Sequence, residues 1–171
     1  MKKTFFLFCF VFCFTIAGNA QTVSGKSDEL LNKLNAQFTP ETTGGKLISF
    51  AKTMIGVPYR YASSNPSIGF DCSGFVSYVF RNFGVKVPRS SREFNLAGSP
   101  IKLENAKVGD ILVFTGSNAR KRVVGHVGII AEIEKGTIHF IHSSSGKAKG
   151  VTISTLDKHY RSRLLRTVSI L

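Results

Sequence analysis

The fold can be predicted most directly from residues 70–84, which read FDCSGFVSYVFRNFG. Asp71 is a good helix N-cap, because its carboxylate can accept a hydrogen bond from a free backbone N–H of the first turn. Gly84 is a typical end signal. The apolar side chains between them recur at helical spacing, at Phe75, Val76, Val79, Phe80 and Phe83. The stretch therefore predicts an amphipathic helix with Cys72 in its first turn, off the apolar stripe.

A second short helix is predicted upstream of this one. Apolar residues recur at helical spacing from Leu47 to Ile55 and stop at Gly56, with Pro58 just beyond. Residues 59–70 then form a loop that leads into the cysteine helix.

Downstream of residue 84, short runs rich in β-branched and aromatic residues predict strands. They cover residues 110–115, 126–133 and 137–142, with a further run near 151–153. Helices followed by strands favour an α+β fold, in which the helices pack on an antiparallel sheet.

The length and composition bound the domain organisation. The chain has 171 residues, 43% of them hydrophobic, which suffices for one compact core. Residues 1–20 combine two lysines, an apolar run and a small-residue end, as a secretory signal peptide does. The run is shorter than the roughly 20 residues of a membrane-spanning helix, so we expect cleavage after Ala20 and no transmembrane anchor. Residues 21–45 are interpreted as a polar N-terminal arm with a helix capped by Ser27, and residues 46–171 as the main domain.

The charge is strongly basic, with a formal net value of +13. Loss of residues 1–20 removes two lysines and no acid, which leaves 21 basic and 10 acidic side chains and a balance of +11. Apart from local clusters at 120–122 and 161–166, the basic residues are scattered, which does not favour a nucleic-acid partner. An anionic cell envelope is the simpler partner.

Cys72 is the one cysteine that remains once residues 1–20 are removed. A single thiol in an exported protein is either a small buried hydrophobe or a reactive group. The first turn of a helix favours the thiolate, and the small neighbours Ser73 and Gly74 leave room for a substrate backbone. Cys72 is therefore the candidate nucleophile, with a buried structural cysteine as the alternative.

A thiol nucleophile needs an imidazole partner, and the chain offers His126, His139, His142 and His159. If residues 134–136 form a three-residue hairpin loop that ends in a left-handed glycine, Gly128 faces His142 across the hairpin. His126 and His142 then share one face of the sheet, on a diagonal of roughly 7 to 8 Å, and His139 points to the other. The pattern favours a functional pair, with structural histidines as the alternative.

Three motifs resemble those of the NlpC-type, papain-like peptidoglycan endopeptidases: Phe70 to Val76, Gly125 to Ile129, and Phe140 to Ser143. Segments from Gly56 to Tyr61, Pro88 to Ser91 and Gly109 to Phe114 also match. The likeness runs from Leu47 to about Leu165. It implies a papain-like fold in a single-domain member of the family, with the nucleophile at a helix start, and no metal or other cofactor.

The resemblance also implies a role for each site residue. Cys72 would be the nucleophile, His126 the general base, and His142 the polar residue that orients His126. Tyr59 would line the site near the oxyanion. The two residues that flank the nucleophile, Asp71 and Ser73, would help to shape the substrate pocket.

One departure from the family pattern is visible, since Ala62-Ser63 stands where members often have two glycines. We expect the pocket of this chain to differ in the loop that follows.

The expected activity is cysteine-dependent hydrolysis of peptidoglycan peptides by an exported protein, periplasmic or secreted. Many relatives carry a wall-binding domain that selects a free stem-peptide end, and residues 21–45 are too short for one. This favours the D-alanyl-diaminopimelate cross-link over the γ-D-glutamyl-diaminopimelate stem bond as the substrate. Remoter alternatives are an amidase or acyltransferase of the same superfamily, a non-catalytic wall-binding module, and a zinc site built from the cysteine and the two histidines.

Overall fold

The structure is a computed structural model that describes residues 42–171. The expected signal peptide, almost all of the polar arm and the helix capped by Ser27 lie outside this range. Within it, no helix combines the length and the apolar character that a membrane crossing requires.

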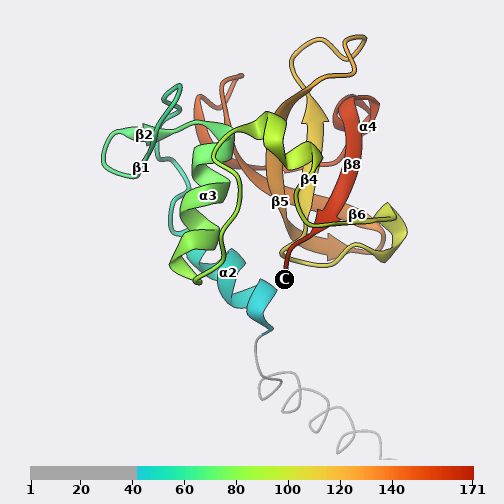
Figure 1. The fold of residues 1–171 in the computed structure, drawn as a ribbon, viewed down its shortest axis with the longest axis horizontal. Coiled ribbons are helices and arrows are strands. Elements are labelled where there is room, and N and C mark those ends of the chain that lie inside the picture. The colour runs from blue at the N-terminus through green and yellow to red at the C-terminus, as the bar shows by residue number, and fades with distance from the viewer. Residues whose placement is uncertain (1–41) are drawn as a thin grey trace, which may run out of the picture. The chain divides into compact units, whose positions relative to one another are not determined.

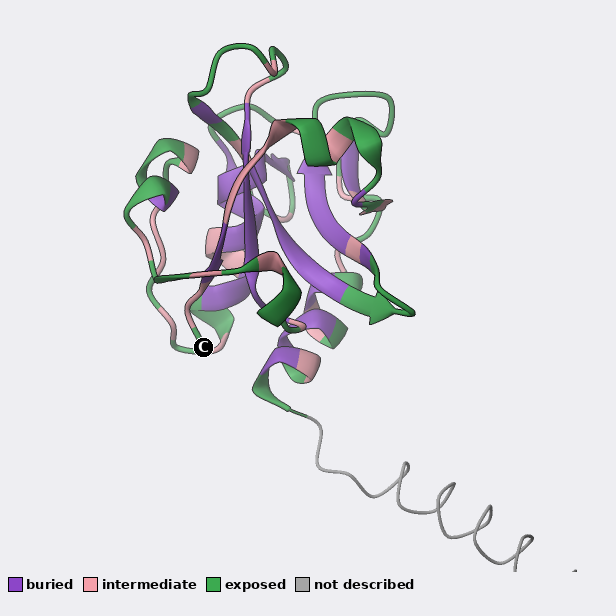
Figure 2. Ribbon diagram, turned by 90° about the vertical axis from the view of Figure 1, so that its right-hand side faces the viewer, coloured by how far each residue is buried: buried purple, intermediate pink, exposed green. Residues whose placement is uncertain are grey.

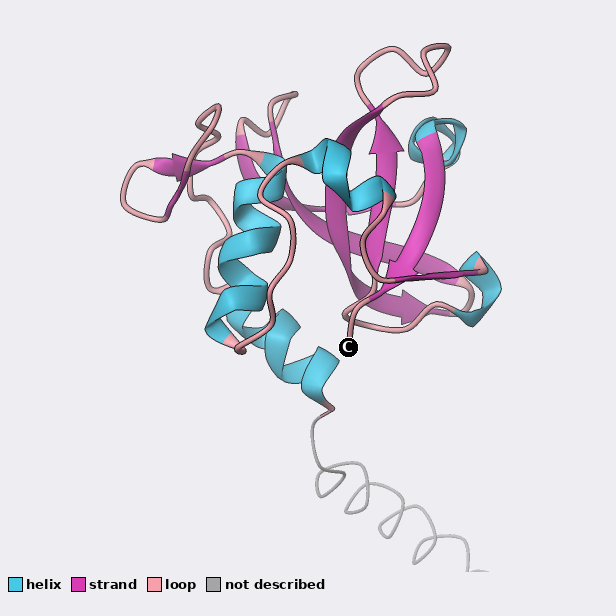
Figure 3. Ribbon diagram, in the orientation of Figure 1, coloured by secondary structure: helices cyan, strands magenta, loops and turns pink. Residues whose placement is uncertain are grey.

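Two helices precede a six-stranded antiparallel sheet, as the sequence predicts. Helices α2 (Thr43–Lys52) and α3 (Cys72–Asn82) lie together on one side of the sheet, and the short α4 (Lys158–Arg163) lies on the other (Figures 1 and 3). The strand order is β3-β8-β4-β5-β6-β7. The strands are β3 (Ser99–Ile101), β4 (Ile111–Thr115), β5 (Val124–Glu134), β6 (Thr137–Ser144), β7 (Gly150–Thr155) and β8 (Leu164–Ser169). The smaller elements are the paired strands β1 (Ser64–Asn65) and β2 (Gly69–Phe70) and the 3-10 helices Ser91–Asn95 and Leu103–Asn105.

Helix α3 begins where the sequence predicts. The Asp71 side chain accepts a hydrogen bond from the Gly74 N–H at 2.6 Å, so it caps the helix, and Cys72 is the first helical residue. Helix α2 begins earlier than predicted, at Thr43, because the Thr42 hydroxyl accepts a hydrogen bond from the N–H of Gly45. It ends at Lys52, and turns continue to Gly56.

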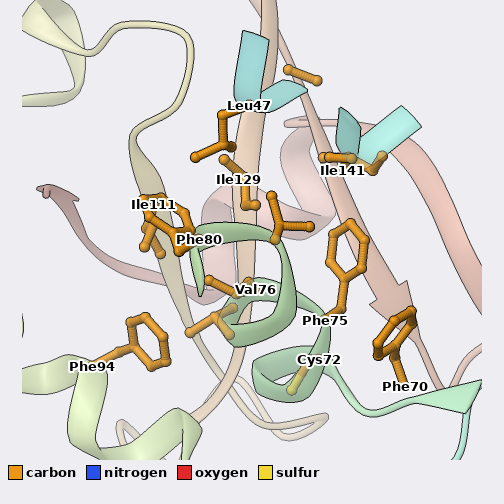
Figure 4. Close-up of a cluster of buried hydrophobic side chains, with 14 of the residues drawn as sticks. Leu47, Phe70, Cys72, Phe75, Val76, Phe80, Phe94, Ile111, Ile129 and Ile141 are labelled. Atoms are coloured by element: carbon orange, nitrogen blue, oxygen red, sulfur yellow. The ribbon is translucent and has the colours of Figure 1, made fainter. Parts of the chain in front are cut away.

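The main core lies between the helices and the sheet. Figure 4 shows the apolar side chains of α3 pointing into it, and Figure 2 shows that this side of the helix is buried. The members at its centre include Leu47, Phe75, Val76, Phe80, Ile129 and Ile141. A smaller cluster packs on the other face of the sheet, around Phe114 and Phe140. The sheet therefore separates two apolar layers, as expected for a sheet covered on both faces.

Cys72 is buried, which corrects one expectation. Its position off the apolar stripe suggested that it lay outside the core, yet it is 8% exposed and packs in the main cluster (Figure 4). The reason is tertiary, because strand β5 packs against α3 and the backbone of its residue Val127 contacts the thiol.

The hairpin of β5 and β6 differs from the prediction at its turn. Only Lys135 and Gly136 lie between the strands, both with positive φ, at 48° and 78°, which is the geometry of a two-residue type I′ turn. A register shift near Ala131 places one extra residue on β5, after which Ile129 pairs with Ile141. The bulge adds the residue that the shorter turn lacks, so the register predicted for the two histidines is confirmed although the predicted loop was wrong.

Candidate active site

At the N-terminal end of α3, polar and charged side chains surround the buried carboxylate of Asp71. Arg89 donates to both carboxylate oxygens, from Nη1 to Oδ1 at 3.0 Å and from Nη2 to Oδ2 at 2.8 Å. The Ser73 hydroxyl donates to the same Oδ1 at 3.1 Å. Together with the capping bond from Gly74, these partners satisfy the carboxylate, so the buried charge is paired as stability requires.

Cys72 opens onto a pocket of about 420 Å³, which we call the Cys72 pocket. Tyr59, Asp71 and Ser73, the three residues that the resemblance assigned to substrate binding, all line it. The other lining residues are Tyr61, Ala62, Arg89, Ser90, Ser91 and Gly125. Arg89 lies in a segment that matched the family pattern, but no role was predicted for it.

The two residues that depart from the family pattern lie at this pocket and beneath it. Ala62 lines the pocket and has a left-handed backbone, with a φ of 58°, which is unusual for a residue other than glycine. Ser63 is buried, and its hydroxyl donates to the carbonyl of Gly69 at 2.6 Å. Ala62 therefore places a methyl group in the wall of the pocket. The hydroxyl of Ser63 joins the two ends of the 63–69 loop by a hydrogen bond.

The thiol of Cys72 is held in its neutral form more strongly than the sequence suggests. Burial raises the pKa of this thiol, a backbone hydrogen bond from Val127 lowers it, and the Asp71 carboxylate raises it further. The backbone N–H groups of Cys72 and Ser73 at the helix start do lower the pKa, as expected, but desolvation is the larger effect and the net shift is upward. Burial also raises the pKa of Tyr59, with Cys72 as the next contributor, which places the phenol close to the thiol.

His126 and His142 form the hydrogen-bonded pair that the sheet register predicts. The distance from His126 Nε2 to His142 Nδ1 is 2.8 Å. His142 Nε2 lies 2.9 Å from Ser154 Oγ on β7, so the contact extends to a third residue that the sequence did not indicate. His139 is turned away from this pair, and its Nδ1 contacts the hydroxyl of Thr155.

Aromatic rings enclose one member of the pair. His142 is 1% exposed and packs against Phe140 and Tyr160, with ring centroids 4.7 and 5.7 Å away. Burial, and after it the positive charge of Arg163, lowers the pKa of His142 to about 4. Burial also lowers the pKa of His126 well below its ordinary value, with His142 and then Arg163 as further causes. Both imidazoles are therefore neutral at pH 7.

Strand β5 connects the two halves of the site. Gly125 lines the Cys72 pocket and also a second pocket lined by His126, while the backbone of Val127 contacts the thiol. Gly125 and Val127, the two neighbours of His126 in the chain, therefore both lie at the Cys72 site. Within residues 42–171, the His, Cys, Asp and Glu side chains form no cluster of three that could hold a metal ion.

We expect the burial of His142 to make stability pH-dependent. Because the folded pKa is depressed to about 4 from an ordinary 6.5, the unfolded chain binds this proton first as the pH falls. The stabilisation is complete above pH 6.5 and is lost as the pH falls towards about 4. Urea unfolding at several pH values should show a loss of about 1.4 kcal/mol per pH unit in this window, beyond that of His142→Gln. Parallel curves for the two proteins would contradict the assignment.

A cysteine at a helix start and a histidine pair on neighbouring strands of an antiparallel sheet define a papain-like fold. The chain belongs to the NlpC/P60 family, whose model matches residues 56–169. Among solved structures, it is similar to an NlpC/P60 family protein from Bacillus cereus ATCC 10987, with a TM-score of 0.65 and 28% identity over 77% of this chain and 41% of that one.

Two curated relatives are similar in sequence. The Gamma-DL-glutamyl hydrolase of Bacillus subtilis is 39% identical over 122 residues, which are 71% of this chain and 28% of that protein. The Murein DD-endopeptidase MepS/Murein LD-carboxypeptidase of Escherichia coli K12 is 38% identical over 107 residues, which are 61% of this chain and 50% of that protein. The chain thus matches about a quarter to a half of the length of these relatives.

Proposed function

We propose that the chain is an exported cysteine endopeptidase that hydrolyses peptides of cell-wall peptidoglycan, with Cys72 as the nucleophile. The observation that carries the proposal is the hydrogen-bonded row His126, His142 and Ser154, on the strands beside the start of α3. Both curated relatives are named as hydrolases of glutamyl or murein peptides, which supports the same substrate class. The basic surface of the chain suits an anionic envelope.

In the resting enzyme, the thiol and the imidazole are both neutral, since the pKa of Cys72 is raised and that of His126 is lowered. His126 therefore acts as a general base during attack, rather than holding a preformed thiolate. It takes the thiol proton as sulfur bonds to the carbonyl carbon. It then gives the proton to the leaving amine when the peptide bond breaks. Water afterwards hydrolyses the thioester.

The row of contacts is compatible with the tautomers that this reaction needs. If His142 donates its Nε2 proton to Ser154 Oγ, its Nδ1 is free to accept from His126 Nε2–H. That leaves His126 Nδ1 unprotonated and able to accept the proton of Cys72. His142 then orients the base, and Ser154 holds His142 in the required tautomer.

We expect the preferred substrate to be the D-alanyl-diaminopimelate cross-link. The DD-endopeptidase name of the Escherichia coli relative supports this preference. The γ-D-glutamyl-diaminopimelate stem bond is the second candidate. It is favoured by the name of the Bacillus subtilis relative, whose match covers more of this chain.

The test is to incubate the protein from Gln21 onward with purified muropeptides and to identify the products by mass. Cross-linked dimers should be converted to monomers, and iodoacetamide should abolish the reaction while a chelator should not. Intact dimers together with loss of L-Ala-D-Glu from monomeric peptides would reverse the order of the two bonds. Inhibition by the chelator alone would point to metal chemistry.

A further inference from the structure

The second pocket, which we call the His126 pocket, differs from the Cys72 pocket in its charge. It has a volume of about 370 Å³, and its lining includes His126, Lys147, His159 and Arg163. None of its lining residues is an aspartate or a glutamate. Gly125 lines both pockets, so the two hollows adjoin at the start of strand β5, next to His126.

The chemistry of the proposed function assigns different halves of the substrate to the two pockets. The acyl half remains bonded to Cys72 after the first step and so occupies the Cys72 pocket. The leaving amine receives its proton from His126, so the leaving half must lie against the histidine. The His126 pocket is thus the place for the residue whose amine is released.

Arg163 is fixed in this pocket by uncharged partners. Its Nε donates to the carbonyl of Gly116 and its Nη2 to that of Thr115, both at 3.1 Å, and its Nη1 lies 3.3 Å from His159 Nε2. A guanidinium has five N–H donors, so two remain free. Among residues 42–171 the ion pair is that of Arg89 with Asp71, and no carboxylate lies at ion-pair distance from Arg163.

The unpaired positive charge of Arg163 disfavours the proposed reaction. The charge of Arg163 lowers the pKa of both His126 and His142, which weakens the base. Asp157, the acid nearest to it in the sequence, caps α4 through a bond from the Tyr160 N–H and does not line the pocket. An anion bound beside Arg163 would offset this effect at the moment when substrate is present.

We infer that the His126 pocket binds a free carboxylate of the leaving residue, held by Arg163 with support from Lys147. This inference rests on the proposed function and names the feature that its substrate must carry. In both candidate bonds the leaving amine belongs to diaminopimelate, a diamino acid that has carboxylates of its own. A fixed guanidinium with free donors suits such a group, because charge-assisted hydrogen bonds to carboxylates are the strong ones.

The experiment compares two synthetic peptides that differ in one group, a free carboxylate or a carboxamide on the residue after the scissile bond. The wild type should cleave the acid with a kcat/KM at least about tenfold higher than the amide. Arg163→Gln should reduce this preference to near one, mainly by slower cleavage of the acid. Lys147→Gln, a change at an exposed side chain, should reduce it by about two- to threefold.

Arg122→Gln is the matched control. Arg122 also donates to backbone carbonyls of the α4 region, those of Ser162 and Leu164, but it does not line the pocket. Its acid-to-amide ratio should equal that of the wild type. A wild-type ratio near one would overturn the inference and leave the proposed function standing, as would equal losses on both peptides in Arg163→Gln. No cleavage of either peptide would instead count against the proposed function itself.

Discussion

Cys72→Ala should abolish peptide hydrolysis, with a loss of at least about 10³-fold in kcat/KM, while the protein remains folded. The loss follows because the variant lacks the sulfur atom that bonds to the carbonyl carbon in the proposed reaction. The free energy of unfolding should fall by only about 1 kcal/mol, since one buried sulfur atom is removed from the edge of the core. Mass analysis of muropeptide products and urea unfolding measure the two effects.

Cys72→Ser is the companion variant, because it keeps an oxygen at the position of the sulfur. A hydroxyl is a much weaker nucleophile than a thiol when its proton must be taken by the same imidazole, so this protein should also be inactive. Measurable turnover in Cys72→Ala would contradict the nucleophile assignment. A loss of several kcal/mol in stability with both variants would favour the alternative of a structural cysteine.

The cysteine helix could be predicted in detail because its signals are local. Asp71 caps it and Gly84 follows its end, and the apolar stripe between them faces the core. The local pattern does not predict how deeply Cys72 is buried. Its burial depends on strand β5, which is far away in the sequence and covers the helix start only in the folded chain.

Two strands of the sheet, β3 and β8, and the helix α4 were not predicted. Strand β8 lies between β3 and β4, yet its first three residues belong to the basic cluster 161–166, which gives no strand signal. Its position depends on pairing with residues 111–114, a long-range contact. Such contacts override the intrinsic preference of a short segment.

The histidine pair could be predicted because a sheet register carries two residues to one face together. The predicted loop was wrong by one residue, and the bulge near Ala131 restored the register. Ser154 and Arg163 could not be predicted in the same way. Ser154 reaches His142 from β7, whose register against β6 was not predicted, and Arg163 reaches the pair from α4, which was not predicted at all.

His126→Ala should reduce kcat by at least about 10³-fold, because the neutral thiol of Cys72 then has no base to accept its proton. His142→Ala should cost less, on the order of 10²-fold, since it removes the group that orients His126 rather than the base. His142→Asn and His142→Gln should retain more activity than His142→Ala, because an amide oxygen can still accept from His126 Nε2–H. Each value should be measured on the same muropeptide dimer with product detection by mass.

His139→Ala is the control that separates position from residue type, since His139 lies on the same strand as His142 but contacts Thr155 instead. It should leave kcat within about twofold of the wild type, as expected for a partly exposed side chain outside the row of contacts. If His139→Ala were as damaging as His142→Ala in a protein that is still folded, the register of β5 against β6 would be wrong. If His126→Ala kept most of its activity, the proton would have to leave Cys72 by another route, and His126 would not be the general base.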